Sequence, residues 1–328
     1  MKKAIKIAGY IFGGVAVLVV IFLIYFNSRF PTVDPPLPVK IEPTSARLER
    51  GKYLAHHVTV CMDCHSTRDW TKLSGPLKFG TLGMGGDKFD ESNAGIPGVL
   101  YAKNITPAGI ERYSDGELMR VITNGVTKEG RAIFPLMPYL GYNNLTREDL
   151  YSIVAYIRSL NRINNSVPEG SLNFPVNLIV KTIPPKSYNP MPEPDKNNPK
   201  ELGKYLVRIA GCFDCHTQMI KGEYLLEKSF AGGFEFHFPG GIVRSANITP
   251  DSISGIGKWS KNYFVERFKM MDPEKLQSQP VSKYDFNTAM PWTMYAGMKS
   301  EDLEAIYEFL KTIKPVKNAV VKFTPAAE

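Results

Sequence analysis

The amino-acid sequence predicts a mostly α-helical protein in which one membrane-spanning helix precedes two copies of one helical domain. Three observations support this: an uncharged apolar run near the N-terminus, two proline-rich segments, and a set of motifs that occurs twice in the same order. The length of 328 residues suits two domains. Hydrophobic residues make up 43% and charged residues 22%, which excludes a disordered, collagen-like or coiled-coil chain.

The apolar run at residues 7–26 predicts a membrane-spanning helix. Helical residues rise about 1.5 Å each, so a run of this length covers a hydrocarbon core of about 30 Å. Lys2, Lys3 and Lys6 precede the run, and by the positive-inside rule they place the N-terminus in the cytoplasm. We therefore predict a single-pass anchor over residues 1–27 in a bacterial inner membrane, with the remaining domains on the periplasmic side.

A cleaved signal peptide is the alternative for this run. Signal-peptide cores usually hold about 7–15 residues and end at small residues of the A-x-A type. This run is longer and continues into Tyr25-Phe26-Asn27-Ser28 without such a site. A lipoprotein signal is excluded because no cysteine precedes Cys61. The sequence therefore favours a retained anchor.

Two proline-rich segments divide the rest of the chain. Residues 28–44 and 163–199 together hold 13 of the 25 prolines, which predicts extended, semi-rigid linkers. The division leaves a first domain at 45–162, a second domain at 200–315 and a C-terminal tail at 316–328.

The two predicted domains are copies of each other. Five motifs recur in one order, with offsets between 143 and 153 residues: GKYL at 51 and 203, C-x-x-C-H at 61 and 212, NITP at 104 and 247, Met-Pro-aromatic at 137 and 290, and EDL at 148 and 301. Only two copies occur, and each is long enough to bury its own core, so the pattern indicates a tandem duplication and not a solenoid.

All four cysteines lie in the two C-x-x-C-H motifs. Cysteines three residues apart on a helical turn can each add to one vinyl group of a single haem, and the adjacent histidine then faces the iron. The motifs therefore predict two covalently bound haem c groups. The predicted thioether residues are Cys61, Cys64, Cys212 and Cys215, and the predicted iron ligands beside them are His65 and His216.

Three other uses of a C-x-x-C pair are less consistent with the sequence. A zinc ribbon places its two pairs about 15–20 residues apart and needs no adjacent histidine, whereas Cys61 and Cys212 are 151 residues apart. A thioredoxin-like redox pair requires a cytosolic βαβ context. Disulfides at this spacing would be strained and would leave the two histidines unexplained.

Each iron also needs a ligand on its opposite face, and the duplication identifies candidates. Met137 and Met290 lie 76 and 78 residues after the first cysteine of their motifs, and a proline and an aromatic residue follow each. Proline fixes φ and stiffens the loop, which helps to hold a weak thioether ligand. We predict Met137 and Met290 as axial ligands. Coordination of the first haem by two histidines, through His56 or His57, remains the alternative, and His237 has no counterpart in the first copy.

Helical patterns accompany the motifs in both copies. Apolar stripes at helical spacing predict buried faces. Thr146 and Ser300, each before an acidic pair, are predicted N-caps, and Gly51 and Gly203 are predicted points of close helix crossing. The stripes consist of Leu150, Ile153, Val154, Ile157 and Leu160, and of Leu303, Ile306, Leu310 and Ile313.

The net charge of +8 and the isoelectric point of about 9.1 raise the question of nucleic-acid binding. Three of the 40 basic residues flank the anchor, so the remaining chain carries 37 basic against 32 acidic residues, a net charge of +5. The basic residues form no run interleaved with aromatics, and no G-x-x-x-x-G-K-[ST] phosphate loop is present. We predict no nucleic-acid partner.

Together these residues resemble class I c-type cytochromes, and more narrowly the multihaem cytochrome subunits of periplasmic alcohol, aldehyde and gluconate dehydrogenases. The resemblance covers roughly residues 45–315 and is closest in the second copy, in FAGGF at 230, NITPD at 247, GIGKWS at 255 and AMPW at 289. It implies two mostly helical domains, each around one haem, with His65/Met137 and His216/Met290 as axial pairs. The chain differs in having two haem motifs where those subunits usually have three, and an N-terminal instead of a C-terminal anchor.

The predicted function is that of a membrane-anchored dihaem cytochrome c that relays single electrons between redox proteins: a membrane or periplasmic dehydrogenase, a respiratory complex or a terminal oxidase. Because His/Met ligation leaves no open iron position, we expect no chemistry on a bound substrate and no enzyme activity of its own. The different residues Tyr139 and Trp292 after the two methionines predict unequal potentials. Two alternatives remain: a dihaem cytochrome c peroxidase-type enzyme with one open haem, and an integral cytochrome subunit of a respiratory or dehydrogenase complex.

Overall fold

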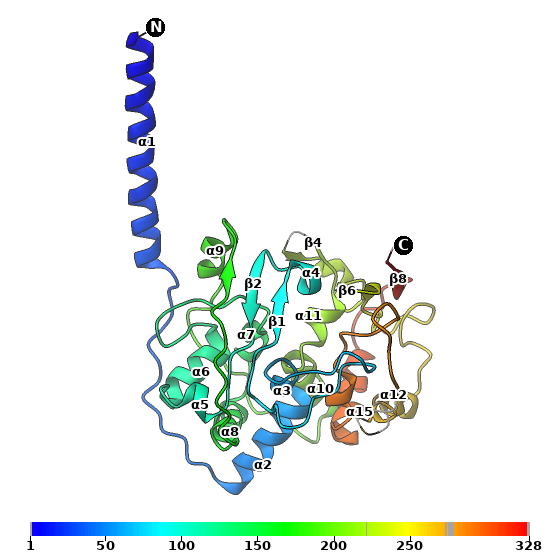
Figure 1. The fold of residues 1–328 in the computed structure, drawn as a ribbon. Coiled ribbons are helices and arrows are strands. Elements are labelled where there is room, and N and C mark those ends of the chain that lie inside the picture. The colour runs from blue at the N-terminus through cyan, green and yellow to red at the C-terminus, as the bar shows by residue number, and fades with distance from the viewer. Residues whose placement is uncertain (1, 221, 273, 275–278, 327–328) are drawn as a thin grey trace.

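A single long helix, α1 (Lys2–Arg29), stands apart from the rest of the molecule (Figure 1). None of its residues is buried, and it is long and apolar enough to cross a membrane. The computed structural model describes residues 2–220, 222–272, 274 and 279–326. Met1 of the predicted anchor and residues 327–328 of the predicted tail lie outside the described residues.

The first copy is built on two helices that cross at a glycine. Helix α2 (Ser45–Tyr53), which continues into the π-helical turn η1 (Leu54–Val58), packs against α8 (Arg147–Arg158). A Cβ atom added to Gly51 would lie 1.9 Å from the carbonyl oxygen of Ser152, so only glycine allows this approach. The predicted close crossing is confirmed.

The second copy repeats this arrangement. Helix α10 (Pro199–Ile209) packs against α15 (Ser300–Leu310), and a Cβ atom at Gly203 would lie 1.9 Å from the carbonyl oxygen of Ala305. The predicted cap at Thr146 is confirmed, because its hydroxyl accepts from the Asp149 amide. The prediction for Ser300 was wrong: α15 begins at Ser300, and Lys299 occupies the N-cap position without a side-chain bond.

Both apolar stripes lie in the core. Every residue of the first stripe is buried, and so are Leu303, Ile306 and Leu310 of the second, while Ile313 packs partly buried against them. One continuous hydrophobic cluster contains buried residues of both copies, including Leu54 and Leu206 at equivalent positions. The two copies therefore share one hydrophobic core and are not separate domains joined only by a linker.

Shorter elements fill the segments between these helices, and the structure is mostly helical as predicted. In the first copy they are α3 (Cys61–Cys64), β1 (Lys88–Asp90), α4 (Glu91–Ala94), β2 (Gly98–Tyr101), α5 (Pro107–Ile110), α6 (Asp115–Asn124) and α7 (Tyr139–Tyr142). In the second they are α11 (Cys212–His216), β4 (Met219–Ile220), β5 (Glu223–Tyr224), η3 (Leu226–Lys228), β6 (Glu235–Phe238), β7 (Gly241–Arg244), α12 (Lys261–Lys269) and α14 (Trp292–Tyr295).

The second proline-rich segment is more ordered than the predicted linker. It holds β3 (Ser171–Leu172), α9 (Val176–Ile179) and the 3-10 turn η2 (Val180–Thr182), and β3 pairs antiparallel with β2 of the first copy. The tail likewise contributes β8 (Phe323–Pro325), which pairs antiparallel with β7. Strand pairing between distant segments leaves no local signal, so proline content alone predicted only an extended path.

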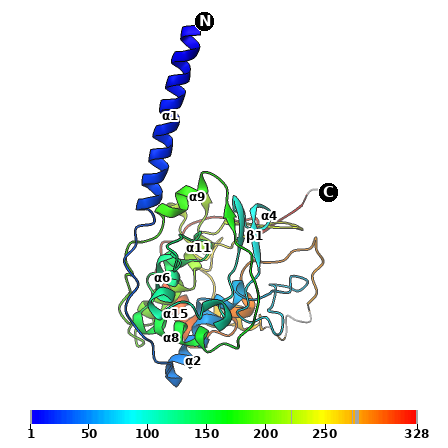
Figure 2. The same ribbon diagram turned by 60° about the vertical axis from the view of Figure 1, so that its left-hand side comes forward.

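We call the part of the molecule that follows the strap-like first proline-rich segment, residues 45–326, the head. The first proline-rich segment runs down the side of the head from α1 to α2 (Figures 1 and 2). The Asp34 amide donates to the Lys186 carbonyl at 2.8 Å, and the Ile41 amide donates to Asp115 Oδ2 at 2.7 Å. A Cβ atom at Gly116 would lie 1.9 Å from the Leu37 carbonyl oxygen. We call residues 31–43 the strap, because they are bonded to the head along their length.

Two reciprocal hydrogen bonds join the copies. The Tyr53 hydroxyl of the first copy donates to Asp302 of the second, and the Tyr205 hydroxyl of the second donates to Asp149 of the first at 2.7 Å. The tyrosines come from the two GKYL motifs and the aspartates from the two EDL motifs. The copies are therefore related by an approximate two-fold arrangement, in which the same surface of each contacts the other.

Candidate functional site

The first C-x-x-C-H motif forms the short helix α3, whose N-cap residue Val60 has a φ of 45°. This left-handed backbone is unfavourable for a β-branched residue. In the second copy the equivalent residue is Gly211, with a φ of 66°, before α11. Both copies thus turn the chain in the same way immediately before the first cysteine, and the strained valine indicates that the turn itself is required.

All four cysteines are free thiols, so the structure does not support disulfides within the motifs. Burial, with a contribution from the Asp63 carboxylate, raises the pKa of Cys64 to about 12. Desolvation by the surrounding protein, with contributions from the Asp214 carboxylate, likewise raises the pKa values of Cys212 and of the surface-exposed Cys215 to about 12. The side chains therefore stand as neutral thiols.

The two motif histidines are held in the same way. His65 Nδ1 lies 2.6 Å from the carbonyl oxygen of Lys103, and His216 Nδ1 lies 2.7 Å from that of Ala246. A carbonyl oxygen only accepts, so Nδ1 carries the proton in both rings and Nε2 keeps its lone pair. Burial lowers the pKa of both histidines, which favours the neutral ring. This arrangement is typical of an imidazole that binds a metal through Nε2.

The NITP motifs fix the position of the two carbonyl groups to which the histidine Nδ1 atoms donate. Each of these carbonyls belongs to the residue directly before the motif. Asn104, directly after Lys103, accepts from the Thr106 amide at 2.9 Å and donates to the Ile163 carbonyl at 2.8 Å. Asn247, directly after Ala246, makes the equivalent bonds to Thr249 and Val316 at 2.9 and 2.8 Å. The motif therefore orients the histidine through the residue that precedes it.

The two predicted methionine ligands have matching surroundings. Met137 and Met290 are partly buried against the core, and a proline N-cap then starts α7 or α14. The Met137 carbonyl accepts from the Tyr139 amide at 2.7 Å, and the Met290 carbonyl accepts from the Trp292 amide at 2.8 Å. The loops are thus built alike in both copies.

A tyrosine connects each methionine segment with its own cysteine motif. The Tyr142 hydroxyl donates to the Thr59 carbonyl at 2.5 Å, two residues before Cys61. The Tyr295 hydroxyl donates to the Ala210 carbonyl at 2.6 Å, two residues before Cys212. Segments far apart in sequence are therefore brought together around each motif. The offset of 153 residues relates the two tyrosines, so the duplication contained the signal that would have identified them.

The remaining histidines have other surroundings. His56 Nε2 lies 2.7 Å from the Tyr156 hydroxyl, and His57 Nδ1 lies 2.9 Å from the Met294 carbonyl of the second copy. His57 also fits against Gly297, where a Cβ atom would lie 2.1 Å from the ring. His237 is exposed on β6. His57 therefore takes part in the contact between the copies.

A buried ion pair beside the first motif was not predicted from the sequence. Arg68 Nη1 donates to Asp63 Oδ2 at 2.8 Å, and each side chain is only 8% exposed. Arg68 also donates to the carbonyls of Ser74 and Gly75 at 2.8 and 3.0 Å. In addition to burial and Asp214, the Asp63 carboxylate raises the pKa of Cys215, which belongs to the other copy. The two cysteine motifs therefore lie close to each other.

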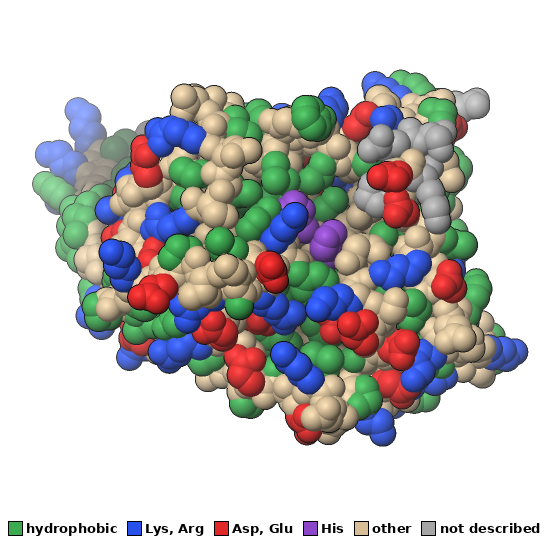
Figure 3. All heavy atoms as spheres, turned by 90° about the horizontal axis from the view of Figure 1, so that it is seen from below, with side chains coloured by type: hydrophobic (Ala, Val, Ile, Leu, Met, Phe, Trp, Pro, Cys, Tyr) green, Lys and Arg blue, Asp and Glu red, His purple; other side chains and the backbone are tan. Residues whose placement is uncertain are grey.

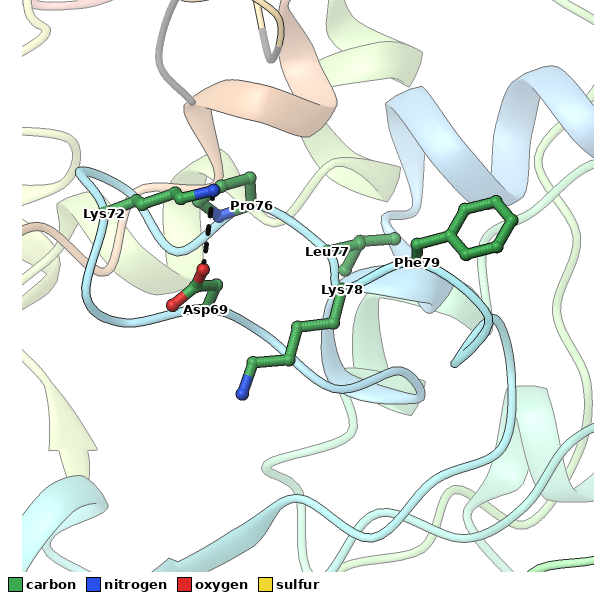
Figure 4. Close-up of a pocket in the computed structure, with 6 residues that line it drawn as sticks. All are labelled: Asp69, Lys72, Pro76, Leu77, Lys78 and Phe79. Atoms are coloured by element: carbon green, nitrogen blue, oxygen red, sulfur yellow. Dashed lines mark ion pairs between the residues drawn. The ribbon is translucent and has the colours of Figure 1, made fainter. Parts of the chain in front are cut away.

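A hollow of about 410 Å³ lies within the loop that follows Arg68 (Figure 4). An ion pair of Lys72 with Asp69, 3.6 Å long, spans part of it, and the Phe79 ring points away and is fully exposed. None of the predicted cysteine, histidine or methionine residues is among its lining residues, which are Asp69, Lys72, Pro76, Leu77, Lys78 and Phe79. The hollow is therefore distinct from the predicted ligand sites.

Basic and acidic side chains are mixed on one face of the molecule. On the face seen from below, lysine and arginine side chains are interspersed with aspartate and glutamate (Figure 3). Many of the basic side chains are in ion pairs, such as Arg47 with Glu148 and Arg158 with Asp115. The modest net charge is therefore not concentrated on this face.

No family model matches the sequence, but curated relatives do. The chain is 26% identical over 299 residues to the alcohol dehydrogenase (quinone) cytochrome c subunit of Gluconacetobacter polyoxogenes, which covers 85% of this chain and 58% of the relative. It is 29% identical over 252 residues to the fructose dehydrogenase cytochrome subunit of Gluconobacter japonicus, covering 71% of this chain and 47% of the relative.

A third relative is a diheme cytochrome c-type protein of Cereibacter sphaeroides, 27% identical over 216 residues, covering 63% of this chain and 67% of the relative. The chain thus spans about half the length of these two dehydrogenase subunits. The resemblance indicated by the motifs is confirmed: homologues of this chain are cytochrome c subunits of alcohol, fructose and gluconate dehydrogenases and a diheme cytochrome c.

Proposed function

We propose that the chain carries two haem c groups, one in each of the domains 45–162 and 200–315, and relays single electrons between redox proteins. The observation that carries this proposal is the repeated histidine geometry. In both copies Nδ1 donates to a backbone carbonyl and Nε2 remains available beside two free thiols. The names of the relatives as cytochrome c subunits imply covalently bound haem c and support the same conclusion.

The chain's own residues have four roles in this proposal. Cys61 and Cys64, and likewise Cys212 and Cys215, are the thiols that become thioethers. His65 and His216 offer Nε2 as one axial ligand, oriented from behind by a carbonyl. Met137 and Met290 offer the other, on loops stiffened by proline. Burial of the two rings lowers the pKa of both histidines and so favours the neutral imidazole that can bind a metal.

A bound haem c supplies reversible one-electron chemistry at its iron. The close packing of the copies supports transfer between the two sites, because buried residues of both belong to one continuous hydrophobic cluster. A dehydrogenase is the proposed electron donor, since several relatives are named as subunits of dehydrogenases. A respiratory complex or a terminal oxidase is the proposed acceptor.

The proposed location is the outer face of a bacterial inner membrane. Helix α1 is exposed along its length and apolar enough to span the bilayer once. The lysines before its apolar run support a cytoplasmic N-terminus, which leaves both motifs on the periplasmic side.

Counting covalent haems tests the proposal. The full chain, produced in a host that matures c-type cytochromes, should retain two haems after denaturation, measured by mass spectrometry and by the pyridine haemochrome spectrum. The double variants C61A/C64A and C212A/C215A should each retain one. A single haem in the unaltered protein, or haem that denaturation releases, would contradict the proposal.

Two further measurements separate the alternatives. Carbon monoxide binding to the reduced protein would indicate an open iron position and therefore a peroxidase-type enzyme. Copurification of a dehydrogenase in mild detergent would indicate an integral subunit of a complex. We expect both haems to be inert to carbon monoxide. Copurification then distinguishes a free-standing carrier from a relay that is an integral subunit of a dehydrogenase complex.

A further inference from the structure

We infer that Ser74, in the first copy, is a positioning residue for Met290, the proposed iron ligand of the second copy. The inference rests on the proposed function and adds a dependence between the two copies. Ser74 has no counterpart among the duplicated motifs. Its hydroxyl nevertheless forms hydrogen bonds with the backbone of the other copy's methionine loop.

The Ser74 hydroxyl lies between two groups of that loop. It donates to the Met290 carbonyl at 2.8 Å and accepts from the Trp292 amide at 3.1 Å. The Ser74 amide donates to Asn287 Oδ1 at 2.9 Å. Ser74 is fully buried and has a φ of 60°, a conformation that costs energy for a residue other than glycine. A buried, strained residue with three bonds to one loop is typical of a brace.

Asn287 completes the contact from the second copy. Its amide nitrogen lies 3.3 and 3.2 Å from the carbonyls of Trp70 and Lys72, and its oxygen also accepts from the Thr288 amide. The Thr288 hydroxyl in turn accepts from the Met290 amide at 3.1 Å. Both peptide groups of Met290 are thereby fixed, one directly by Ser74 and one through Thr288.

The first methionine loop lacks this support. Among the described residues, the Met137 carbonyl accepts from the Tyr139 amide, as Met290 does from Trp292, but no side chain of the second copy bonds to Met137. The extra bonds therefore distinguish the second site from the first. Since a thioether is a weak iron ligand, its retention depends on how well the loop holds it in place.

Arg68 connects the brace with the first cysteine motif. Its guanidinium pairs with Asp63, which lies between Cys61 and Cys64, and donates to the Ser74 carbonyl. A continuous set of buried bonds therefore runs from the first attachment motif to the Met290 backbone. The folding of the first cysteine motif therefore helps to position Met290, the proposed iron ligand of the second site.

Two substitutions of Ser74 in the full-length protein test the inference. Ser74→Ala removes the hydroxyl and keeps the backbone preference, whereas Ser74→Gly removes the hydroxyl and also tolerates the φ of 60°. Ser152→Ala is the matched control: it deletes the hydroxyl of another buried serine of the first copy, at a position where the second copy has Ala305. The readouts are imidazole titration of the oxidised protein and the two midpoint potentials.

We expect both Ser74 variants to bind imidazole at the second haem about fivefold or more tightly than the unaltered protein, the ratio that corresponds to one lost buried hydrogen bond. The midpoint of that haem should fall, while the first haem and the Ser152→Ala protein stay unchanged. Substitution of Met290 by histidine identifies which signal belongs to the second haem.

Unchanged imidazole affinity and midpoint in Ser74→Gly would overturn the inference, and so would an equal effect on both haems. If Ser74→Ala fails to assemble, the glycine variant decides, because it adds no backbone strain. Failure of the proposed function would look different, since the unaltered protein would then lack two covalent haems or a methionine that imidazole displaces.

Discussion

The hydroxyl of Tyr53 donates a 2.5 Å hydrogen bond to Asp302 across the contact between the two copies. Asp302 is 7% exposed, and among the described residues Tyr53 is its side-chain partner. The equivalent Asp149 receives more support: besides the Tyr205 hydroxyl, Arg50 pairs with both of its oxygens at 2.8 Å. The two halves of the contact are therefore alike in geometry but unequal in charge compensation.

Removing each tyrosine hydroxyl should reveal this inequality. We expect Tyr53→Phe to lower the free energy of unfolding by about 1–3 kcal/mol, because it leaves a buried carboxylate without that donor. Tyr205→Phe should cost less, since Arg50 remains on Asp149. Denaturant unfolding followed by circular dichroism measures both, and equal losses would contradict the explanation.

The helix crossings predict a steric effect. Gly203→Ala and Gly51→Ala would each place a Cβ atom 1.9 Å from a backbone carbonyl oxygen, so the paired helices must separate. We expect each to lower the free energy of unfolding by about 1–3 kcal/mol or more. The exposed neighbours Lys204 and Lys52 provide controls, whose alanine variants should stay within about 0.5 kcal/mol of the unaltered protein. A tolerated alanine at either glycine would contradict the close packing.

Exchange of the methionines predicts a redox effect. Because methionine ligation raises the potential of a haem relative to histidine, Met137→His and Met290→His should each lower one of two midpoints and leave the other nearly unchanged. A spectroelectrochemical titration measures both midpoints in one experiment. If neither variant moves a midpoint, the methionines are not ligands.

His56 predicts a dependence of stability on pH. Burial, together with the charges of His57 and Lys52, lowers the pKa of His56 to about 4 from its ordinary 6.5. Between these values the unfolded chain binds a proton that the folded chain does not, so the free energy of unfolding should fall as the pH drops from 6.5 towards 4.

His56→Gln supplies the control, because glutamine can still bond the Tyr156 hydroxyl and does not titrate. The stability of the unaltered protein relative to this variant should decrease through that pH window. Asp87, whose pKa burial raises to about 6, contributes with the opposite sign but equally in both proteins, and so cancels. A difference that does not vary with pH would show that His56 is not buried in its neutral form.

The duplication made much of the fold accessible from sequence. It identified Gly51 and Gly203 as crossing points because a residue conserved between the copies marks a shared constraint, and the apolar stripes followed from helical spacing. It misplaced one helix start, since Ser300 was chosen for its side chain although Lys299 is the equivalent of Thr146. The tyrosines and aspartates of the reciprocal bonds lie in the GKYL and EDL motifs, but no local pattern shows that they meet across the copies.

Contacts that only one of the two copies makes could not be predicted from the sequence, because the comparison of the copies does not reveal them. Arg68 and Asn287 differ from the residues at the equivalent positions of the other copy, Met219 and Phe134. Their contacts, like those of Ser74, depend on how a loop of one copy lies on the other. The proline-rich segments were predicted as linkers, whereas β3 and the strap are bonded to the first copy. Their partners are distant in sequence, so composition carries no information about the pairing.

The strap changes what the N-terminal helix can do for the head. A free tether lets a domain move within a volume that the length of the tether sets. A segment that is bonded along the side of the domain instead keeps the domain next to the point where the segment is anchored. With α1 in the bilayer, the head would stay at one height above the surface. A partner in the same membrane would then meet it by two-dimensional diffusion at a raised effective concentration. Breaking the bonds of the strap, from Asp34 to Lys186 and from Ile41 to Asp115, would remove that constraint and let the head move farther from the membrane surface.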